Sequence, residues 1–383
     1  MKRKHVQIAL AGGSPTPVYQ GITHLHPDQI LLVCSEMSKE MAENIRKELH
    51  MYRKEDVLIF PISDTDIKAM YQWAETIEQS LPKGITISLN ITGGMKMWSV
   101  IFSQVFRRRR RSSQIFFIGQ DGTYYDFKNK ESLEKVNFDM DAQFRILGHE
   151  MDSYTPLSEY TNEDFNVLNI VQSLSFSEKT HYFLFCITKL FVEEYKKKYG
   201  NCDYNNPFSV TEKLNSLCWN PDTKTFECKL GHRTYSFSSP HVCSIVLNTG
   251  WFELYVARMI SRTYPAEQIR MNCLFRNKKN TPKNEVDIIV NTGSKLIFVE
   301  CKTQVFDTTS VDKFRSVVHN YGGLGSKHLF VTNSPMKPEA KEKCDDHGIM
   351  TFHFEDPDYS SQQEKVDALA SILVELNKKW NFK

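Results

Sequence analysis

The stretch EVDIIVNTGSKLIFVECKT, from Glu285 to Thr303, predicts two β-strands joined by a short polar turn. Val and Ile dominate both strands, as is typical of buried sheet. Asp287, Glu300 and Lys302 nevertheless interrupt the apolar pattern. Burying a charge costs free energy unless something binds it. The hairpin therefore predicts an α/β domain with a functional site at the end where these charges lie.

Alternation along the strands predicts that the three charged side chains converge. Alternate side chains of a strand share a face, so Glu300 and Lys302 become neighbours at the strand end. An antiparallel hairpin that turns at NTGS pairs Val290 near position 295 or 296, and it brings Asp287 alongside the other two.

A third acid comes from the preceding predicted helix, TGWFELYVARMISRTY. Its only acidic residue, Glu253, shares a helical face with the apolar residues Val256, Ala257 and Ile260. A divalent cation would explain all three acids, because carboxylate oxygens are the ligands that Mg²⁺ and Mn²⁺ prefer. Lys302 would then orient or deprotonate an attacking water and offset charge in the transition state.

The alternative interpretation is a surface hairpin with a Glu–Lys cross-strand pair, which contributes only ~0.2–1 kcal/mol. An isolated E-x-K is usually such a pair. The spacing of helix Glu, strand Asp and E-x-K at facing strand ends favours the catalytic interpretation.

These residues resemble the PD-(D/E)xK core of restriction-endonuclease-like enzymes, with Val286 in place of the proline of the name. The resemblance implies Asp287, Glu300 and the backbone carbonyl of Cys301 as metal ligands. It also implies Glu253 as support for the metal or its water, and Lys302 as the residue that positions the nucleophile. Gln304, one step further on the same face, would touch the water or the phosphate.

A basic loop, RNKKNTPKNE, precedes the strand of Asp287. Arg276, Lys278, Lys279 and Lys283 would hold a nucleic-acid backbone, or they form a solvated loop; the sequence leaves both interpretations open.

The last third continues as an α/β domain, and the first third alternates short apolar runs with amphipathic segments. Strands separated by helices of this length predict a doubly wound, Rossmann-like parallel sheet, which a hairpin around GQDGTYYDF closes. Three predicted helices, the third at SVTEKLNSLCW, and a hairpin around Gly231 predict a small helical, winged-helix-like middle. We expect domains over residues 1–148, 149–240 and 241–383.

Two loops of the first domain predict a ligand site at the carboxyl end of its sheet, where doubly wound folds bind phosphates. The loop after the first strand is AGGSPTPV and the loop after the fourth is NITGGMK, although a Gly-Gly turn is often only a tight connection. The candidate ligand-binding residues are Gly13, Ser14, Thr16, Asn90, Thr92, Gly93, Gly94 and Lys96.

NITGGMK also resembles the signature of CARF domains, the CRISPR-associated Rossmann folds that sense cyclic oligoadenylates. Met95 replaces the usual Thr. A CARF domain before a PD-(D/E)xK domain is similar to the CRISPR ancillary nucleases of type III defence. That resemblance implies a homodimer, activation by cyclic tetra-adenylate, a Mn²⁺ or Mg²⁺ cofactor, and cleavage of single-stranded DNA and RNA with possible nicking of duplex.

Two alternatives stay open. One is a CARF-type regulator that binds DNA through its middle and carries an inactive nuclease fold. The other is a housekeeping repair nuclease whose first domain senses another nucleotide.

Composition fits this interpretation. The chain has 383 residues, a formal net charge of +2 and nine cysteines without a C-x-x-C pair. We therefore expect two or three domains, reduced thiols, local rather than global attraction to nucleic acid, and a soluble cytoplasmic protein without a membrane span. The RRRRR run at residues 107–111 favours a solvated helix end over a nucleic-acid patch, and the Cys and His spacings match no familiar zinc pattern.

Overall fold

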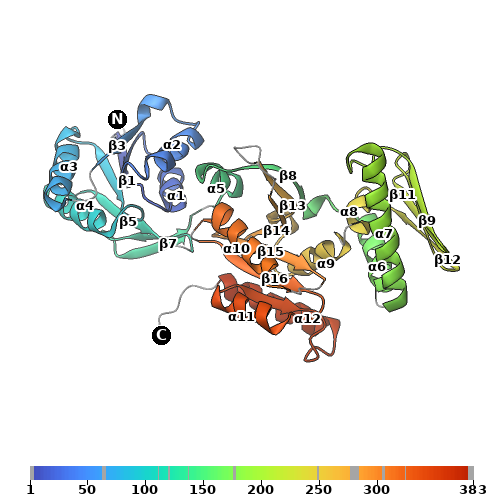
Figure 1. Cartoon of the computed structure of the whole chain (residues 1–383). Coiled ribbons are helices and arrows are strands. Elements are labelled where there is room, and N and C mark those ends of the chain that lie inside the picture. Colours follow the sequence, from blue (N-terminus) through green and yellow to red (C-terminus); the bar gives the residue numbers. More distant parts are fainter. Residues whose placement is uncertain are drawn as a thin grey trace.

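The computed structural model describes residues 4–62, 66–110, 112–119, 121–136, 138–175, 178–247, 250–276, 284–303, 307–323 and 325–377. Its three sheets follow one another along an elongated molecule (Figure 1). The N-terminal domain lies at one end, the middle segment at the other, and the C-terminal domain between them.

The first sheet has seven strands in the order β3-β2-β1-β4-β5-β6-β7. Its first five strands in the chain pair in parallel, and the last two add an antiparallel edge. This confirms the expected Rossmann-like parallel sheet and its closing hairpin. The strands are β1 (His5–Leu10), β2 (Gln29–Cys34), β3 (Val57–Pro61), β4 (Thr86–Asn90), β5 (Gln114–Ile118), β6 (Thr123–Asp126) and β7 (Glu131–Lys135).

Helices cover both faces of this sheet. Met70 and Phe102 pack with one face of β1, whereas Ile22 and Ile45 pack with the other. The apolar residues recur at helical spacing, so each helix buries one stripe against the sheet. These helices are α1 (Thr16–Leu25), α2 (Lys39–Glu48), α3 (Ile67–Ser80) and α4 (Lys96–Arg109), with a 3₁₀ turn η1 (Lys54–Asp56). The next helix, α5 (Met140–Ile146), packs its Phe144 against Phe275 and Phe298 of the C-terminal domain.

The middle segment differs from the expected three-helix module. SVTEKLNSLCW is not a helix but most of an antiparallel strand pair whose turn contains Lys213 at φ 56°. Val210 pairs with Leu217 and both are buried, so the apolar period here is two. The elements are η2 (Leu157–Glu159), α6 (Asn162–Ser175), α7 (Glu178–Tyr199), β9 (Phe208–Glu212), β10 (Asn215–Asn220), β11 (Thr225–Leu230), β12 (Arg233–Ser238) and α8 (Val242–Val246).

The C-terminal sheet has the order β17-β16-β15-β14-β13-β8. Its edge strand β8 (Glu150–Pro156) comes from the range expected for the middle module and pairs with β13 instead. The other strands are β13 (Ile269–Arg276), β14 (Asn284–Asn291), β15 (Leu296–Lys302), β16 (Lys327–Thr332) and β17 (Met350–His353).

Helices also sandwich this sheet. Residues of α9 and α12 share a core with Ile297 and Val299, and α10 and α11 pack with Phe298 on the opposite face. The alternation of β15 therefore runs as expected. Among the described residues, no helix has both the length and the apolar character that crossing a membrane requires. The helices are α9 (Gly250–Ile260), η3 (Ala266–Gln268), α10 (Thr309–Gly322), α11 (Pro338–Asp346) and α12 (Gln362–Asn377).

Candidate active site

The β14–β15 hairpin holds the candidate catalytic residues at its open end. Val290 pairs with Ile297, one or two positions beyond the expected partner at 295 or 296. Ile288 pairs with Val299 in the same register. Continued by one residue, this register sets Asp287 beside Glu300. The turn is closed by the Thr292 N–H, which donates to the Lys295 carbonyl at 3.0 Å.

The Lys302 amine contacts both acids of the hairpin. Its Nζ lies 2.7 Å from Glu300 Oε1 and 3.4 Å from Asp287 Oδ2. The Cys301 backbone N–H also donates to Asp287 Oδ2, at 2.7 Å. Asp287 is only 8% exposed, so these donors compensate for lost hydration. The three side chains that the sequence predicted to converge do so.

The electrostatics of this group favour a bound cation. Burial raises the pKa of Asp287 above its usual value, although Lys302 and the Cys301 N–H act against the shift. Burial, and then the charge of Asp287, raise the pKa of Glu300 to about 7. Burial alone would lower the pKa of Lys302, but Asp287 and Glu300 outweigh it and raise that pKa. The single amine does not fully neutralise the two acids.

Glu253 approaches the same group from α9. Burial raises its pKa well above the usual value, and the charge of Asp287 adds to the effect. The acids from the helix and both strands therefore repel one another inside a partly dry site. An added divalent cation fits this donor set, because it would offset the repulsion that now raises these carboxyl pKa values.

The acids do not form a ready-made metal cage. Over the described ranges, no three Asp, Glu, His or Cys side chains converge on a position that could hold a metal ion. The Lys302 amine instead bridges Asp287 and Glu300. A cation on Asp287, Glu300 and the Cys301 carbonyl would use only two side chains.

Glu285 is a residue of this site that the sequence reasoning missed. Its side chain is exposed, yet partial desolvation, and then the charge of Asp287, raise its pKa, so it lies close enough to interact with the other acids. It stands two positions before Asp287 in β14 and the same alternation rule would have found it. Three of the expected nucleic-acid-binding residues, Lys278, Lys279 and Lys283, lie outside the described residues, as do the Arg276 side chain and Gln304.

Of the expected ligand-binding residues, several hold the loops together. Asn90 is fully buried; its Nδ2 donates to the Pro17 carbonyl at 3.1 Å and its Oδ1 accepts from the Thr92 hydroxyl at 2.6 Å. A Cβ on Gly93 would lie 2.2 Å from the Leu10 carbonyl oxygen, so the two loops pack backbone to backbone. Lys96 is exposed at the start of α4.

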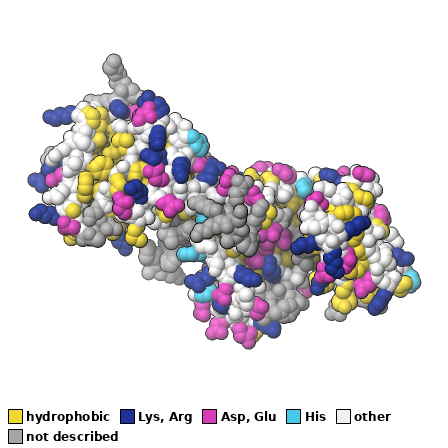
Figure 2. Space-filling model, turned by 45° about the horizontal axis from the view of Figure 1, so that its top comes forward, with side chains coloured by type: hydrophobic (Ala, Val, Ile, Leu, Met, Phe, Trp, Pro, Cys, Tyr) yellow, Lys and Arg dark blue, Asp and Glu magenta, His cyan; other side chains and the backbone are white. Residues whose placement is uncertain are grey.

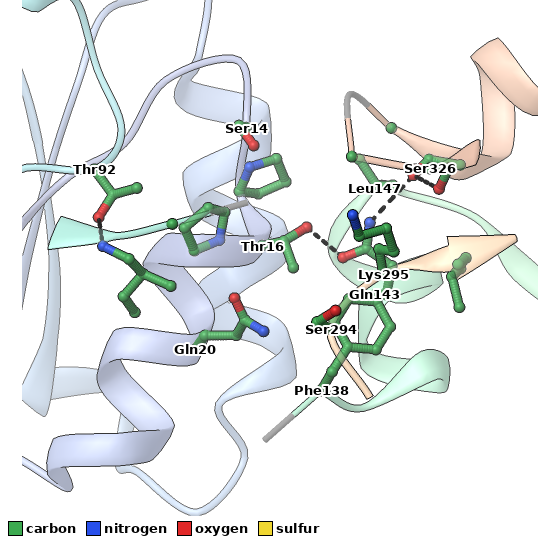
Figure 3. A pocket seen from close by; sticks show the side chains of 18 of the residues that line it. Ser14, Thr16, Gln20, Thr92, Phe138, Gln143, Leu147, Ser294, Lys295 and Ser326 are labelled. Carbon is green, nitrogen blue, oxygen red and sulfur yellow. Dashed lines mark hydrogen bonds between the residues drawn. The ribbon is translucent and has the colours of Figure 1, made fainter. Parts of the chain in front are cut away.

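A cavity of about 190 Å³ lies beside these loops, between the N-terminal and C-terminal domains (Figure 3). Of the expected ligand-binding residues, Gly13, Ser14, Thr16 and Thr92 line it, whereas Asn90, Gly93, Gly94 and Lys96 do not. The facing wall comes from the C-terminal domain and includes Ser294, Lys295 and Ser326. Sequence reasoning did not anticipate this wall, since no motif marks a contact between two domains.

Two weaker sequence signals have structural explanations. Arg109 and Arg110 of the basic run pair with Glu78 of α3, as expected for a helix end rather than a nucleic-acid patch. His241 pairs with Asp164, and its Nδ1 lies 3.1 Å from Asp164 Oδ2.

Two family models match the N-terminal and the C-terminal domain. Residues 19–144 match the family model of the Card1 CARF domain, and residues 252–356 match that of a restriction endonuclease. No curated protein matches the sequence.

Two solved structures resemble nearly the whole chain. Can2 from Sulfobacillus thermosulfidooxidans, in complex with cyclic tetra-adenylate, is 17% identical with a TM-score of 0.70, over 98% of this chain and 100% of that one. Protein VC1899 from Vibrio cholerae is 12% identical with a TM-score of 0.72, over 97% of each chain. At these identities the likeness shows a shared fold.

Proposed function

We propose that this chain, in which a CARF domain is joined to a restriction-endonuclease-like domain, is a metal-dependent endonuclease that a cyclic oligoadenylate activates. The observation that carries the proposal is the Lys302 amine in contact with Asp287 and Glu300, in a domain that matches a restriction endonuclease. An inactive fold would gain nothing from acids whose pKa values burial raises.

The residues of the site have distinct roles in this proposal. Asp287, Glu300 and the Cys301 carbonyl would hold Mn²⁺ or Mg²⁺, which supplies Lewis-acid chemistry and lowers the pKa of water when bound. Lys302, whose raised pKa keeps it protonated, positions the attacking water by donating to it and offsets charge on the phosphate. Glu253 supports the metal or its water from α9.

The CARF domain supplies the regulation. Its match to a family model and the polar loop residues Ser14, Thr16 and Thr92 at the cavity support a cyclic oligoadenylate ligand. Cyclic tetra-adenylate is the ligand of the Can2 complex, and we propose it as the activator here. Activation requires that the ligand favour one placement of the nuclease domain over another.

Single-stranded DNA and RNA are the proposed substrates, with nicking of duplex, in type III CRISPR defence. We also propose a homodimer. Exposed apolar side chains on α3 and α4 support it: Ile67 is 55%, Met97 44% and Val100 55% exposed. Figure 2 shows apolar side chains on the surface of this N-terminal domain.

The test is cleavage of labelled single strands with Mn²⁺, with and without cyclic tetra-adenylate. Wild-type protein should cut only when both are present. Glu300→Gln should lower the rate at least about 100-fold, because it removes a metal-ligand charge. It should also keep the fold, since the neutral amide relieves the repulsion that raises the Glu300 pKa.

The matched control is Glu339→Gln, an exposed acid on α11, which should cut like wild type. Cleavage by Glu300→Gln at the wild-type rate would show that the site is assigned wrongly. Duplex that is retarded but never cut would favour the regulator, and full activity without the ligand would favour the repair nuclease.

A further inference from the structure

The cavity between the CARF and nuclease domains contains a buried amide without a partner. Gln20, on α1, is 4% exposed, and its Nε2 finds no hydrogen-bond acceptor within the described part of the chain. Leaving a buried donor unsatisfied costs about 1–3 kcal/mol. Figure 3 shows the Gln20 amide directed into the space between the two domains. A ligand in the cavity would supply the missing acceptor.

The shape and chemistry of the cavity select the kind of ligand. Its volume of about 190 Å³ is below the roughly 300–1,000 Å³ that hold a whole drug-sized molecule. Apolar walls and polar edges together suit a flat heteroaromatic ring with hydrogen-bonding nitrogens. The apolar walls are Pro15, Pro17, Phe117, Phe138, Leu147 and Leu296.

We propose that one adenine ring of the activator occupies this cavity and accepts a hydrogen bond from Gln20 Nε2. The phosphate beside that ring would lie near Lys295, which lines the cavity from the nuclease side. This inference rests on the proposed function and deepens it, since it makes the nuclease domain part of the activator site.

The position of Lys295 links the ligand to the catalytic residues. Lys295 and Ser294 belong to the turn between β14 and β15, and those two strands carry Asp287 and Glu300. A ligand that touches this turn binds best in one placement of the hairpin relative to the CARF domain. Its binding energy therefore favours that placement, which is how an activator shifts a population.

A second contact makes the same junction sensitive to the ligand. The Thr16 hydroxyl donates to Gln143 Oε1, and Gln143 Nε2 donates to the Gly322 carbonyl at 3.5 Å. These two hydrogen bonds connect the loop after β1 to the end of α10 through Gln143. A ligand that accepts a hydrogen bond from the Thr16 hydroxyl would break the Thr16–Gln143 bond and release Gln143, whose Nε2 holds the end of α10.

Calorimetric titration of the full-length protein with cyclic tetra-adenylate tests the inference. Gln20→Leu and Lys295→Met should each weaken binding by about tenfold or more, because each removes a hydrogen bond or charge-assisted contact. Gln20→Leu should melt at or above the wild-type temperature, since it removes an unsatisfied buried amide. A residue with a purely structural role would show the opposite change in stability.

The controls are Gln72→Leu on α3 and Lys313→Met on α10, which are exposed and should bind like wild type. Wild-type affinity in both Gln20→Leu and Lys295→Met would overturn the shared site while leaving the proposed function intact. Failure of the wild-type protein to bind the ligand at all would instead reject the proposed activator, and this inference with it.

Discussion

At the residue scale, the charged side chains in the sheet are explained by their neighbours. Burying Asp287 or Glu300 without a partner would cost free energy. Lys302 contacts both acids, the Cys301 N–H donates to Asp287, and in the proposed enzyme a metal ion would also compensate for their charge. Alternation alone predicted that they converge. It could not predict the extent of their burial, which raises their pKa values and depends on the packing of α9 against the hairpin.

A buried histidine makes stability depend on pH. Burial lowers the pKa of His328 on β16 to about 4, and Lys327 and Arg315 add to the effect. The ring packs edge-on against Phe314. The unfolded chain binds a proton near pH 6.5, whereas the folded chain does not until about pH 4. Stability from this group is therefore complete above about pH 6.5 and is lost as the pH falls toward 4.

Lowering the pH from 7.5 to 5 should reduce the free energy of unfolding by about 1–2 kcal/mol through His328, as measured by urea titration at each pH. His328→Phe should lose that part of the pH dependence. His319→Phe, at an exposed position on α10, should keep it. An unchanged slope in His328→Phe would contradict the assignment.

At the element scale, the loops after β1 and β4 show why glycine follows these strands. The loops touch backbone to backbone, with no room for a side chain on Gly93. The sequence pattern predicts ligand contacts at Gly93 and Gly94, and the tertiary structure adds a packing role for Gly93. In the middle segment, residues 209–219 form strands and not a helix, because a turn divides them and Val210 and Leu217 are buried in the core that α7 shares.

Gly93→Ala should therefore destabilise the N-terminal domain. Its Cβ would lie 2.2 Å from the Leu10 oxygen, which β1 holds in place, and such overpacking costs about 1–3 kcal/mol or more. The control is Gly13→Ala in the neighbouring loop, where a Cβ meets nothing within 4 Å. Thermal unfolding of the two variants gives the comparison, and equal melting temperatures would refute the packing role.

At the scale of the whole molecule, the C-terminal domain lies between the other two (Figure 1). It shares a cavity with the loop after β1, and its α9 packs against α6 and α8 of the middle segment. β8 contributes to this arrangement, because it follows the CARF domain in the chain and pairs at the edge of the nuclease sheet. A movement of the N-terminal domain would therefore shift β8 at the edge of the C-terminal sheet.

The exposed apolar residues of α3 and α4 predict the assembly. Val100→Glu should convert a dimer to a monomer in light scattering after size exclusion, because a charge in an apolar interface is costly to desolvate. Val374→Glu, at the similarly exposed Val374 on α12, should remain dimeric. A monomeric wild-type protein, or a dimeric Val100→Glu, would show that this face is not the interface.

The sequence by itself determined the parallel sheet, the β14–β15 hairpin and the convergence of Asp287, Glu300 and Lys302, because strand alternation and helical spacing are local rules. Only the tertiary structure decided that Ser209–Trp219 pairs as strands and that Gln20 and Lys295 face one cavity. Those outcomes depend on which surfaces meet after the domains pack, and no local period records that residues so far apart in the chain line one cavity.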